Sequence, residues 1–212
     1  MENDFFEFGS QLGSTTLQAH PIGLRPRGKS GSLADSQRLI IGDFDSIQFP
    51  VTFKQEHGKK LRDVLDTGHA GLYLISDRMR KVLEENKLSG WECFSISLVD
   101  KNNKEIPGYM GLSITGRCGP IDISRSEIIE KRLVPNGVLS AYYKGMYIGL
   151  EKWDQSDFFL PEHYYGTMVT TKVAEVIKSN KLTNVRLTNL ADIEINEITA
   201  ELIRSKTQPR AI

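Results

Sequence analysis

Two stretches of this chain carry the same pattern, and this repetition limits the available folds more than any other feature. The first stretch covers residues 74–91, the second covers residues 168–185, and the two align without a gap. Apolar positions align with apolar positions, and both stretches contain Asn-Lys-Leu followed by a hydroxyl residue. Each stretch predicts the end of a strand, a hydroxyl residue that caps a helix, a short helix and a second strand.

Both expected helices carry an apolar stripe at a spacing of three and four residues. The stripes consist of Met79, Val82 and Leu83 in the first helix and Val173, Val176 and Ile177 in the second. Residues at this spacing share one side of a helix, so both helices should pack on a sheet. We therefore predict an α+β fold of mixed or antiparallel sheets with short helices packed on them. Two related β-α-β units are expected within it, over residues 74–99 and 168–190.

The patterning predicts one main domain with two less regular ends. In residues 1–36 a cluster of phenylalanines (Phe5, Phe6 and Phe8) is followed by glycine, serine, threonine and proline, which indicates a flexible or peripheral segment. Residues 37–204 are predicted to form a single α+β domain, and residues 205–212 a frayed tail.

Further elements are expected between the two repeated stretches and around them. Alternating apolar residues over 47–53 predict a half-buried strand, for which Pro50 favours an edge position. The remaining expected elements are a strand at 38–41, a hairpin over 91–115, strands within 138–150, helices at 59–65 and 121–130, and a terminal helix or irregular tail over 191–204.

Charge argues against nucleic acid as the partner. Lysine plus arginine number 27 and aspartate plus glutamate number 27, so the formal net charge is zero. A nucleic-acid-binding chain usually has a basic balance or a concentrated basic stretch. The nearest approach to one is Arg25, Arg27 and Lys29, which proline and glycine separate, so a polar surface segment is the better interpretation.

The sequence offers no targeting signal. Glu2 and Asp4 stand where a signal peptide has basic residues, and no apolar run approaches the ~20 residues that span a bilayer. We expect a cytoplasmic protein without a membrane partner. Cys93 and Cys118 lack Cys-x-x-Cys spacing, so neither a disulfide framework nor a redox motif is predicted.

No motif in the chain predicts an active site. The histidines (His20, His57, His69 and His163) have no metal-binding spacing, and the glycine-rich residues 116–120 match no nucleotide-binding pattern. We predict no catalytic residue, no metal and no cofactor. An enzyme with a scattered site is an alternative, and it would use His163 with Asp157 or Glu162, which share one loop.

That loop, residues 153–165, gives the clearest binding signal because it concentrates aromatic and acidic side chains. Aromatic residues provide large contact areas and are common in binding hot spots. The partner-binding residues predicted here are Trp153, Asp154, Asp157, Glu162, Tyr164 and Tyr165. Phe158 and Phe159 have an alternative interpretation, in which they fill the core between the two halves of the chain.

The repeated stretches resemble a family of bacterial immunity proteins encoded beside polymorphic toxins. The matching residues are 74–91, Asp157 to Phe159 in the loop, and 168–187. Asn184 stands where the family tends to have glycine, and asparagine also tolerates a left-handed backbone. The resemblance implies a cytoplasmic antidote that binds a cognate toxin domain and blocks it, without catalysis. A structural or regulatory interaction domain is the other non-enzymatic interpretation.

Overall fold

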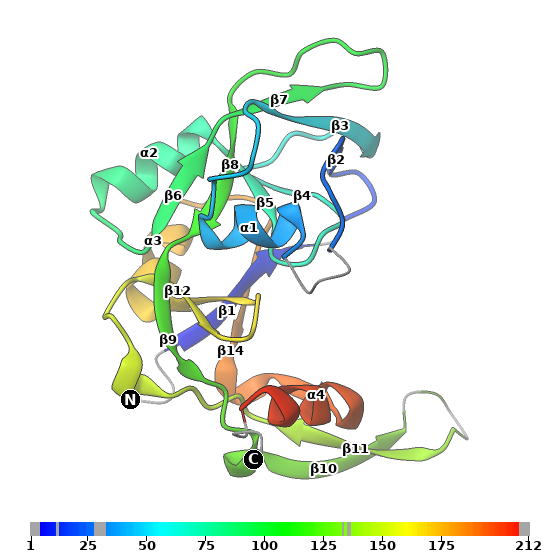
Figure 1. The fold of residues 1–212 in the computed structure, drawn as a ribbon, viewed down its shortest axis with the longest axis vertical. Helices are drawn as coiled ribbons and strands as arrows, with labels where there is room; N and C mark the ends of the chain where they lie inside the picture. The colour runs from blue at the N-terminus through cyan, green and yellow to red at the C-terminus, as the bar shows by residue number, and fades with distance from the viewer. Residues whose placement is uncertain (1–4, 12, 28–32, 133, 135–136, 208–212) are drawn as a thin grey trace.

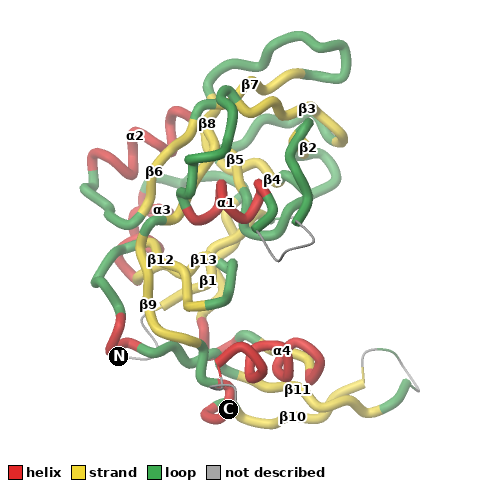
Figure 2. Tube along the Cα trace, viewed as in Figure 1, coloured by secondary structure: helices red, strands yellow, loops and turns green. Residues whose placement is uncertain are grey.

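The computed structural model describes residues 5–11, 13–27, 33–132, 134 and 137–207, and it has an α+β fold, as predicted (Figure 1). The strands form three sheets of different size. Within the described residues, four α-helices accompany them: α1 (Asp35–Ile41), α2 (Asp77–Glu85), α3 (Thr171–Ser179) and α4 (Glu197–Thr207). Helices α2 and α3 lie on the same side of the molecule (Figure 2).

The largest sheet has seven strands and is mixed. Its order is β6 (Trp91–Phe94), β8 (Tyr109–Ile114), β5 (Tyr73–Ser76), β4 (Val64–Asp66), β2 (Gln18–Pro21), β3 (Val51–His57) and β7 (Ile96–Val99). The pairs β2–β4 and β3–β7 are parallel, and the other pairs are antiparallel.

The second sheet has five strands and separates two cores. Its order is β14 (Val185–Asn189), β1 (Phe5–Ser10), β13 (Thr167–Thr170), β12 (Phe158–Glu162) and β9 (Gly116–Pro120). Phe158 and Val169 belong to the larger core, whereas Phe159 and Met168 belong to the smaller one. Successive strand residues point to opposite faces, so both faces of β12 are covered. The interpretation of Phe158 and Phe159 as core residues is confirmed.

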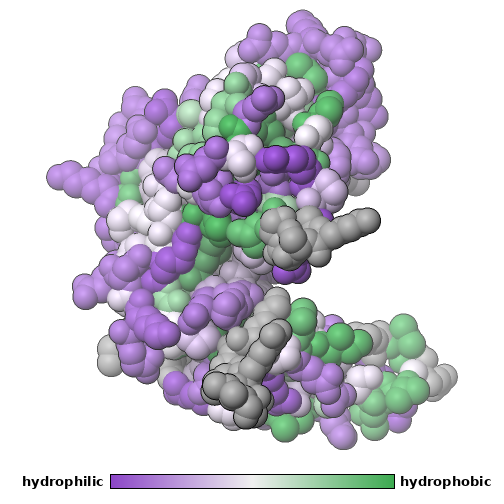
Figure 3. All heavy atoms as spheres, viewed as in Figure 1, coloured by the Kyte–Doolittle hydropathy of each residue, from purple (hydrophilic) through white to green (hydrophobic). Residues whose placement is uncertain are grey.

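A third, three-stranded sheet forms, together with helix α4, the part of the molecule that we call the C-terminal lobe. The sheet has the order β10 (Glu127–Arg132), β11 (Leu139–Lys144) and β15 (Glu194–Asn196), and α4 packs on it. The two larger sheets with α1, α2 and α3 form the main body. The space-filling view has a notch between the main body and the lobe (Figure 3).

The two repeated stretches have matching local geometry. Helices α2 and α3 each have nine residues, and in each the side-chain amide of the asparagine at the helix end, Asn86 or Asn180, donates to a valine carbonyl one turn earlier. The following lysines, Lys87 and Lys181, both have a φ of 50°. Gly90 and Asn184 then both have positive φ, so the asparagine adopts the backbone conformation expected of it.

The strands around these helices correspond as well. β4 pairs with β5 as β12 pairs with β13, with Val64 opposite Ile75 and Phe158 opposite Val169. On the other side, β8 lies between β5 and β6, and β1 lies between β13 and β14. The registers also agree. When β5 is matched with β13 and β6 with β14, each β8 residue and its β1 counterpart differ in residue number by the same amount in both pairings.

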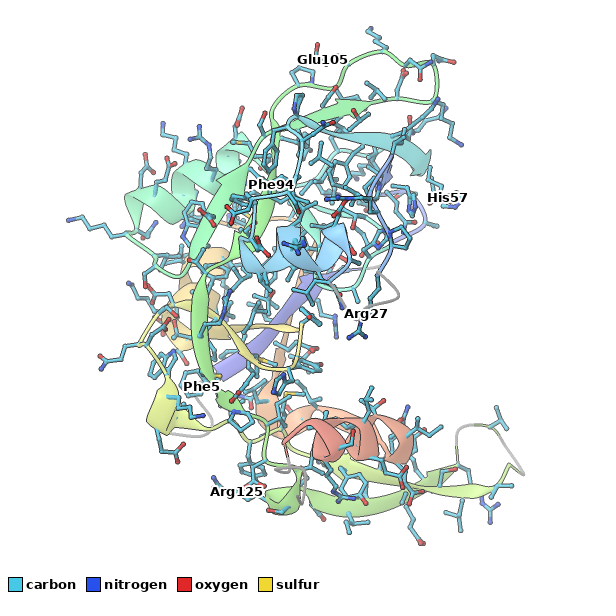
Figure 4. The ribbon with its side chains drawn as sticks, viewed as in Figure 1. Phe5, Arg27, His57, Phe94, Glu105 and Arg125 are labelled. Carbon is cyan, nitrogen blue, oxygen red and sulfur yellow. The ribbon has the colours of Figure 1, made fainter. Side chains whose placement is uncertain are left out.

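The N-terminal segment differs from the prediction. Residues 1–36 were expected to be flexible or peripheral, but β1 is an interior strand of one sheet and β2 an interior strand of another. Phe5, labelled in Figure 4, is buried in the smaller core, and Phe8 is buried in the larger core. Both strands pair with distant segments, so the short-range pattern gave no sign of them. Residues 1–4 and 28–32 lie outside the described residues.

Three short elements were predicted with the wrong type. Residues 38–41 belong to helix α1, which starts at a capping contact from the Ala34 N–H to Gln37 Oε1 and ends at Gly42. Residues 59–65 are not helical, because Val64 and Leu65 are buried in strand β4 at the middle of the seven-stranded sheet. Residues 121–130 form a 3₁₀ turn (Ile123–Arg125) that Asp122 caps, followed by strand β10.

Two predicted strands are placed differently, and the C-terminal helix begins at Glu197, after strand β15, rather than at residue 191. β3 lies between β2 and β7 rather than at an edge, because Pro50 precedes the strand and takes no ladder position. The expected hairpin over 91–115 forms only between β6 and β8. The strand is interrupted at Ser95, and the part after it, β7, pairs with β3 instead. Helix α4 includes residues 205–207 of the expected tail, and 208–212 are outside the described part.

Candidate partner-binding surface

The predicted binding loop begins with a tryptophan that is tied to the core. The Trp153 ring lies 5.3 Å from the ring of Phe5 and 5.6 Å from that of Phe159, measured between centroids. Its Nε1 donates a hydrogen bond of 3.2 Å to the Ser156 carbonyl. These contacts leave Trp153 half-buried and hold the first part of the loop against the smaller core.

Asp154 fixes the first part of the loop through hydrogen bonds from backbone N–H groups. Its Oδ2 accepts a 2.8 Å hydrogen bond from the Arg117 backbone N–H, and its Oδ1 accepts one of 3.0 Å from the Ser156 N–H. Burial acts to raise the pKa of Asp154, but the bonds from Ser156 and Arg117 outweigh it and the pKa is lowered. Asp154 therefore remains charged and joins the loop to β9.

Asp157 is buried and fully engaged by neighbouring groups. Its carboxylate accepts from the Ser89 backbone N–H (2.9 Å), Ser89 Oγ (3.2 Å), Lys172 Nζ (3.1 Å) and Thr170 Oγ1 (3.3 Å). Ser89 lies in the turn after α2, whereas Thr170 and Lys172 lie at the start of α3. Asp157 thus joins the two repeated stretches to each other.

Asp63 makes the corresponding set of contacts, and sequence reasoning missed it. Its carboxylate accepts from the Thr183 backbone N–H (2.7 Å), Thr183 Oγ1 (2.8 Å), Arg78 Nη1 (2.7 Å) and Ser76 Oγ (2.9 Å). Burial acts to raise the pKa of Asp63, but the bonds from Thr183 and Ser76 and the Arg78 charge lower it overall. The one signal in the sequence was that Asp63 precedes the first stretch by the same interval as Asp157 precedes the second.

The second part of the loop is accessible, in the turn between β12 and β13. Glu162 and His163 are exposed; Glu162 forms a long ion pair with Lys152 (3.6 Å), and its other carboxylate oxygen lies 3.7 Å from His163 Nε2. His163 has a φ of 62°, in the left-handed region of backbone conformation that histidine adopts more often than most residues. In Figure 1 this turn lies on the side of the main body that faces α4.

The two tyrosines of the turn border a hollow of about 350 Å³. Tyr164 donates a 3.0 Å hydrogen bond to Glu7 Oε1, and Glu7 Oε2 lies 3.6 Å from Arg186 Nη2. Burial and then the charges of Asp66 and Glu7 raise the pKa of Tyr73 to about 12, and burial with Glu7 also raises the pKa of Tyr164. Both phenols are therefore neutral hydrogen-bond donors at physiological pH.

Of the residues considered for an enzyme site, the structure brings His163 together with Glu162. Asp157 is engaged with Ser89, Thr170 and Lys172, and of the two carboxylates considered only Glu162 lies beside His163. Burial raises the pKa of Cys93 to about 11 and that of Cys118 to about 12, which disfavours a reactive thiolate in either. Among the described residues, no three or more histidine, cysteine, aspartate or glutamate side chains are grouped so that they could hold a metal ion.

The C-terminal lobe carries an apolar surface that the sequence did not reveal. Nine large hydrophobic side chains are exposed within the described residues, and six of them lie in this lobe. The six are Ile128, Val134, Val138, Leu139, Ile198 and Leu202. Exposed apolar side chains gathered in one region are typical of an interaction surface. Hydrophobic spheres are visible along the lobe below the notch (Figure 3).

The chain is therefore an α+β protein with two accessible surfaces: the aromatic and acidic turn between β12 and β13, and the exposed apolar side chains of the C-terminal lobe. The Immunity protein family (Imm11) matches residues 15–192, so the chain belongs to this family. Among curated proteins, no relative matches the chain. None of the helices in the described residues is both long enough and apolar enough to cross a membrane.

Proposed function

We propose that this protein neutralises one cognate toxin domain by binding it and covering a surface that the toxin needs. The observation that carries the proposal is membership of the immunity family over residues 15–192. Protection by occlusion requires no catalysis, cofactor or metal from the immunity protein. It takes place in the cytoplasm and involves neither nucleic acid nor a membrane.

We also propose that the loop over residues 153–165 contributes to the contact through its accessible part. Glu162 and His163 are exposed, and Tyr164 and Tyr165 lie half-buried behind them. Trp153, Asp154 and Asp157 contribute mainly by fixing the loop, because their rings and carboxylates already have partners inside the molecule. Acidic and aromatic groups of this kind suit a toxin surface that offers lysine or arginine.

Co-expression with the toxin domain encoded beside this gene tests the proposal. The wild-type protein should restore growth, and the purified pair should form a stable complex of fixed stoichiometry. Glu162→Lys should weaken the complex without changing the melting temperature, while Glu85→Lys, at an exposed glutamate of helix α2, serves as a matched control. Absence of both protection and binding would refute the function. Protection without a stable complex would instead favour a regulatory or enzymatic role.

We further infer that residues 63–94 with β8, and residues 157–189 with β1, are two copies of one unit. Support comes from the matched helix ends, the shared strand registers and the equivalent contacts of Asp63 and Asp157. In this interpretation the N-terminal strand β1 takes the place in the second copy that β8 has in the first.

A further inference from the structure

The strand register of the C-terminal lobe places exposed apolar side chains on one face of its sheet. Ile128 lies opposite Tyr143, and Leu139 lies opposite Arg132. Paired residues of adjacent strands share a face, and alternate residues along a strand do too, so Ile128 and Leu139 lie on the same side as Tyr143. This is the side that α4 covers, because Tyr143 packs in one cluster with Ala200 and Ile203 of that helix.

Helix α4 extends this apolar face on its outer side. Ala200 and Ile203 point toward the sheet and are buried, whereas Ile198 and Leu202 are 80% and 55% exposed. The two exposed residues are four positions apart, which places them on one stripe of the helix directed away from the sheet. We call Ile128, Leu139, Ile198 and Leu202 the lobe face; α4 lies on the side of the sheet toward the notch (Figure 1).

The rim of the lobe face is mainly acidic. Glu130 lies on the same side of β10 as Ile128, and Glu197 and Glu201 stand beside Ile198 and Leu202 on α4. All three are exposed, and within the described part of the chain none of them forms an ion pair. The basic residues on this side already have partners, since Arg132 donates to the Gly137 carbonyl and Arg204 lies over the Tyr143 ring. An apolar centre with an acidic rim is complementary to a partner with an apolar patch among lysines and arginines.

We propose that the lobe face is the main docking surface for the toxin domain, and that this domain presents apolar side chains within a basic rim. The proposal rests on the immunity function proposed above and adds the location and chemistry of the contact. The family match ends at residue 192, so α4 lies outside the region matched to the family. If α4 forms part of the docking surface, family members can share the main body while the residues that recognise one particular toxin lie on α4.

Isothermal titration tests the assignment, with the toxin domain encoded beside this gene as the probe, held inactive by substitution of its active site. The double variant Ile198→Glu, Leu202→Glu should weaken binding at least about 100-fold, because it places charge at the centre of the contact. A matched control, Ile22→Glu, Leu61→Glu, changes two exposed apolar residues of the main body and should bind like wild type. Circular dichroism and the melting temperature verify that both variants fold.

Charge reversal tests the chemistry of the partner separately. The variant Glu197→Lys, Glu201→Lys should weaken binding at least about tenfold, and added salt should weaken binding by the wild-type protein but affect this variant less. If reversal strengthens binding or has no effect, the basic rim assigned to the toxin is wrong.

The outcomes separate this proposal from the function on which it rests. If the wild-type protein does not bind the toxin domain, the proposed function fails. If the wild type binds and the Ile198, Leu202 variant binds equally well, the function stands and the lobe face is overturned as the docking surface. If the wild type is dimeric alone, and the same variant is monomeric but retains toxin binding, the face is a contact between two copies and the proposal is wrong.

Discussion

At the scale of single residues, Asp63 and Asp157 carry the connection between the two repeated stretches. Each carboxylate is buried and accepts four hydrogen bonds from the residues described above. Because an amide cannot accept all of these bonds, Asp63→Asn and Asp157→Asn should each lower the free energy of unfolding by about 2–4 kcal/mol. Urea titration followed by tryptophan fluorescence measures the change.

The same substitution at an exposed carboxylate provides the control. Asp45 is exposed, so Asp45→Asn should change the free energy of unfolding by less than about 0.5 kcal/mol. A large loss at Asp63 with none at Asp157 would show that the two carboxylates are not equivalent, and would count against two copies of one unit.

The lowered pKa of Asp63 predicts a pH dependence of stability. The unfolded chain has the ordinary aspartate pKa of about 3.9, and the folded value is lower, so the unfolded state takes up the proton first as the pH falls. The contribution of Asp63 is complete above about pH 5 and is lost as the pH falls through the folded pKa. The difference in melting temperature between wild type and Asp63→Asn should therefore be largest at pH 7 and shrink below about pH 4. A constant difference down to pH 3 would contradict this.

Residue roles could be predicted where the partners are close in sequence. The helix stripes follow from a local period, and Met79, Leu83, Val173 and Ile177 are indeed buried. The role of Asp63 could not be predicted, because its partner Thr183 is 120 positions away. For the same reason the sequence could not distinguish Asp154 and Asp157, whose carboxylates accept hydrogen bonds from distant parts of the chain, from Glu162, which forms a long ion pair with Lys152.

At the scale of elements, the sequence predicted correctly the helices whose apolar residues recur at a spacing of three and four positions. α2 and α3 formed where expected, whereas α1, β4 and β10 were assigned the wrong type. The last three are short, and each is determined by distant strands or loops that a short apolar run does not specify. The exposed stripe of α4 could not be foreseen either, since only the packing shows which of its sides meets the sheet.

The helix stripes also give a graded prediction at this scale. Val82 is buried against the larger core, so Val82→Asp should cost about 3 kcal/mol or more, as an unpaired buried charge does. Val176 is only half-buried, and Val176→Asp should cost about half as much because its carboxylate keeps contact with water. Thermal unfolding of both variants measures the order, and the reverse order would mean that α3 packs more tightly than α2.

At the scale of the whole molecule, the N-terminal strand is expected to hold the main body together. β1 pairs with β13 on one side and β14 on the other, and it places Phe5 and Phe8 in different cores. Removing a buried phenylalanine side chain typically costs about 3–5 kcal/mol, and a domain of this kind has only about 5–15 kcal/mol in total. Deletion of residues 1–10 should therefore abolish cooperative unfolding, whereas deletion of residues 1–4 should retain it.

A peptide of residues 1–11, added in trans, makes the prediction specific to the strand. If β1 supplies to the second unit what β8 supplies to the first, the peptide should restore a cooperative transition to the chain that lacks residues 1–10. A peptide with Phe8→Asp should fail, because its charge would enter the larger core without a partner. A truncated chain that melts at the wild-type temperature without any peptide would show that the second unit is complete without its N-terminal strand.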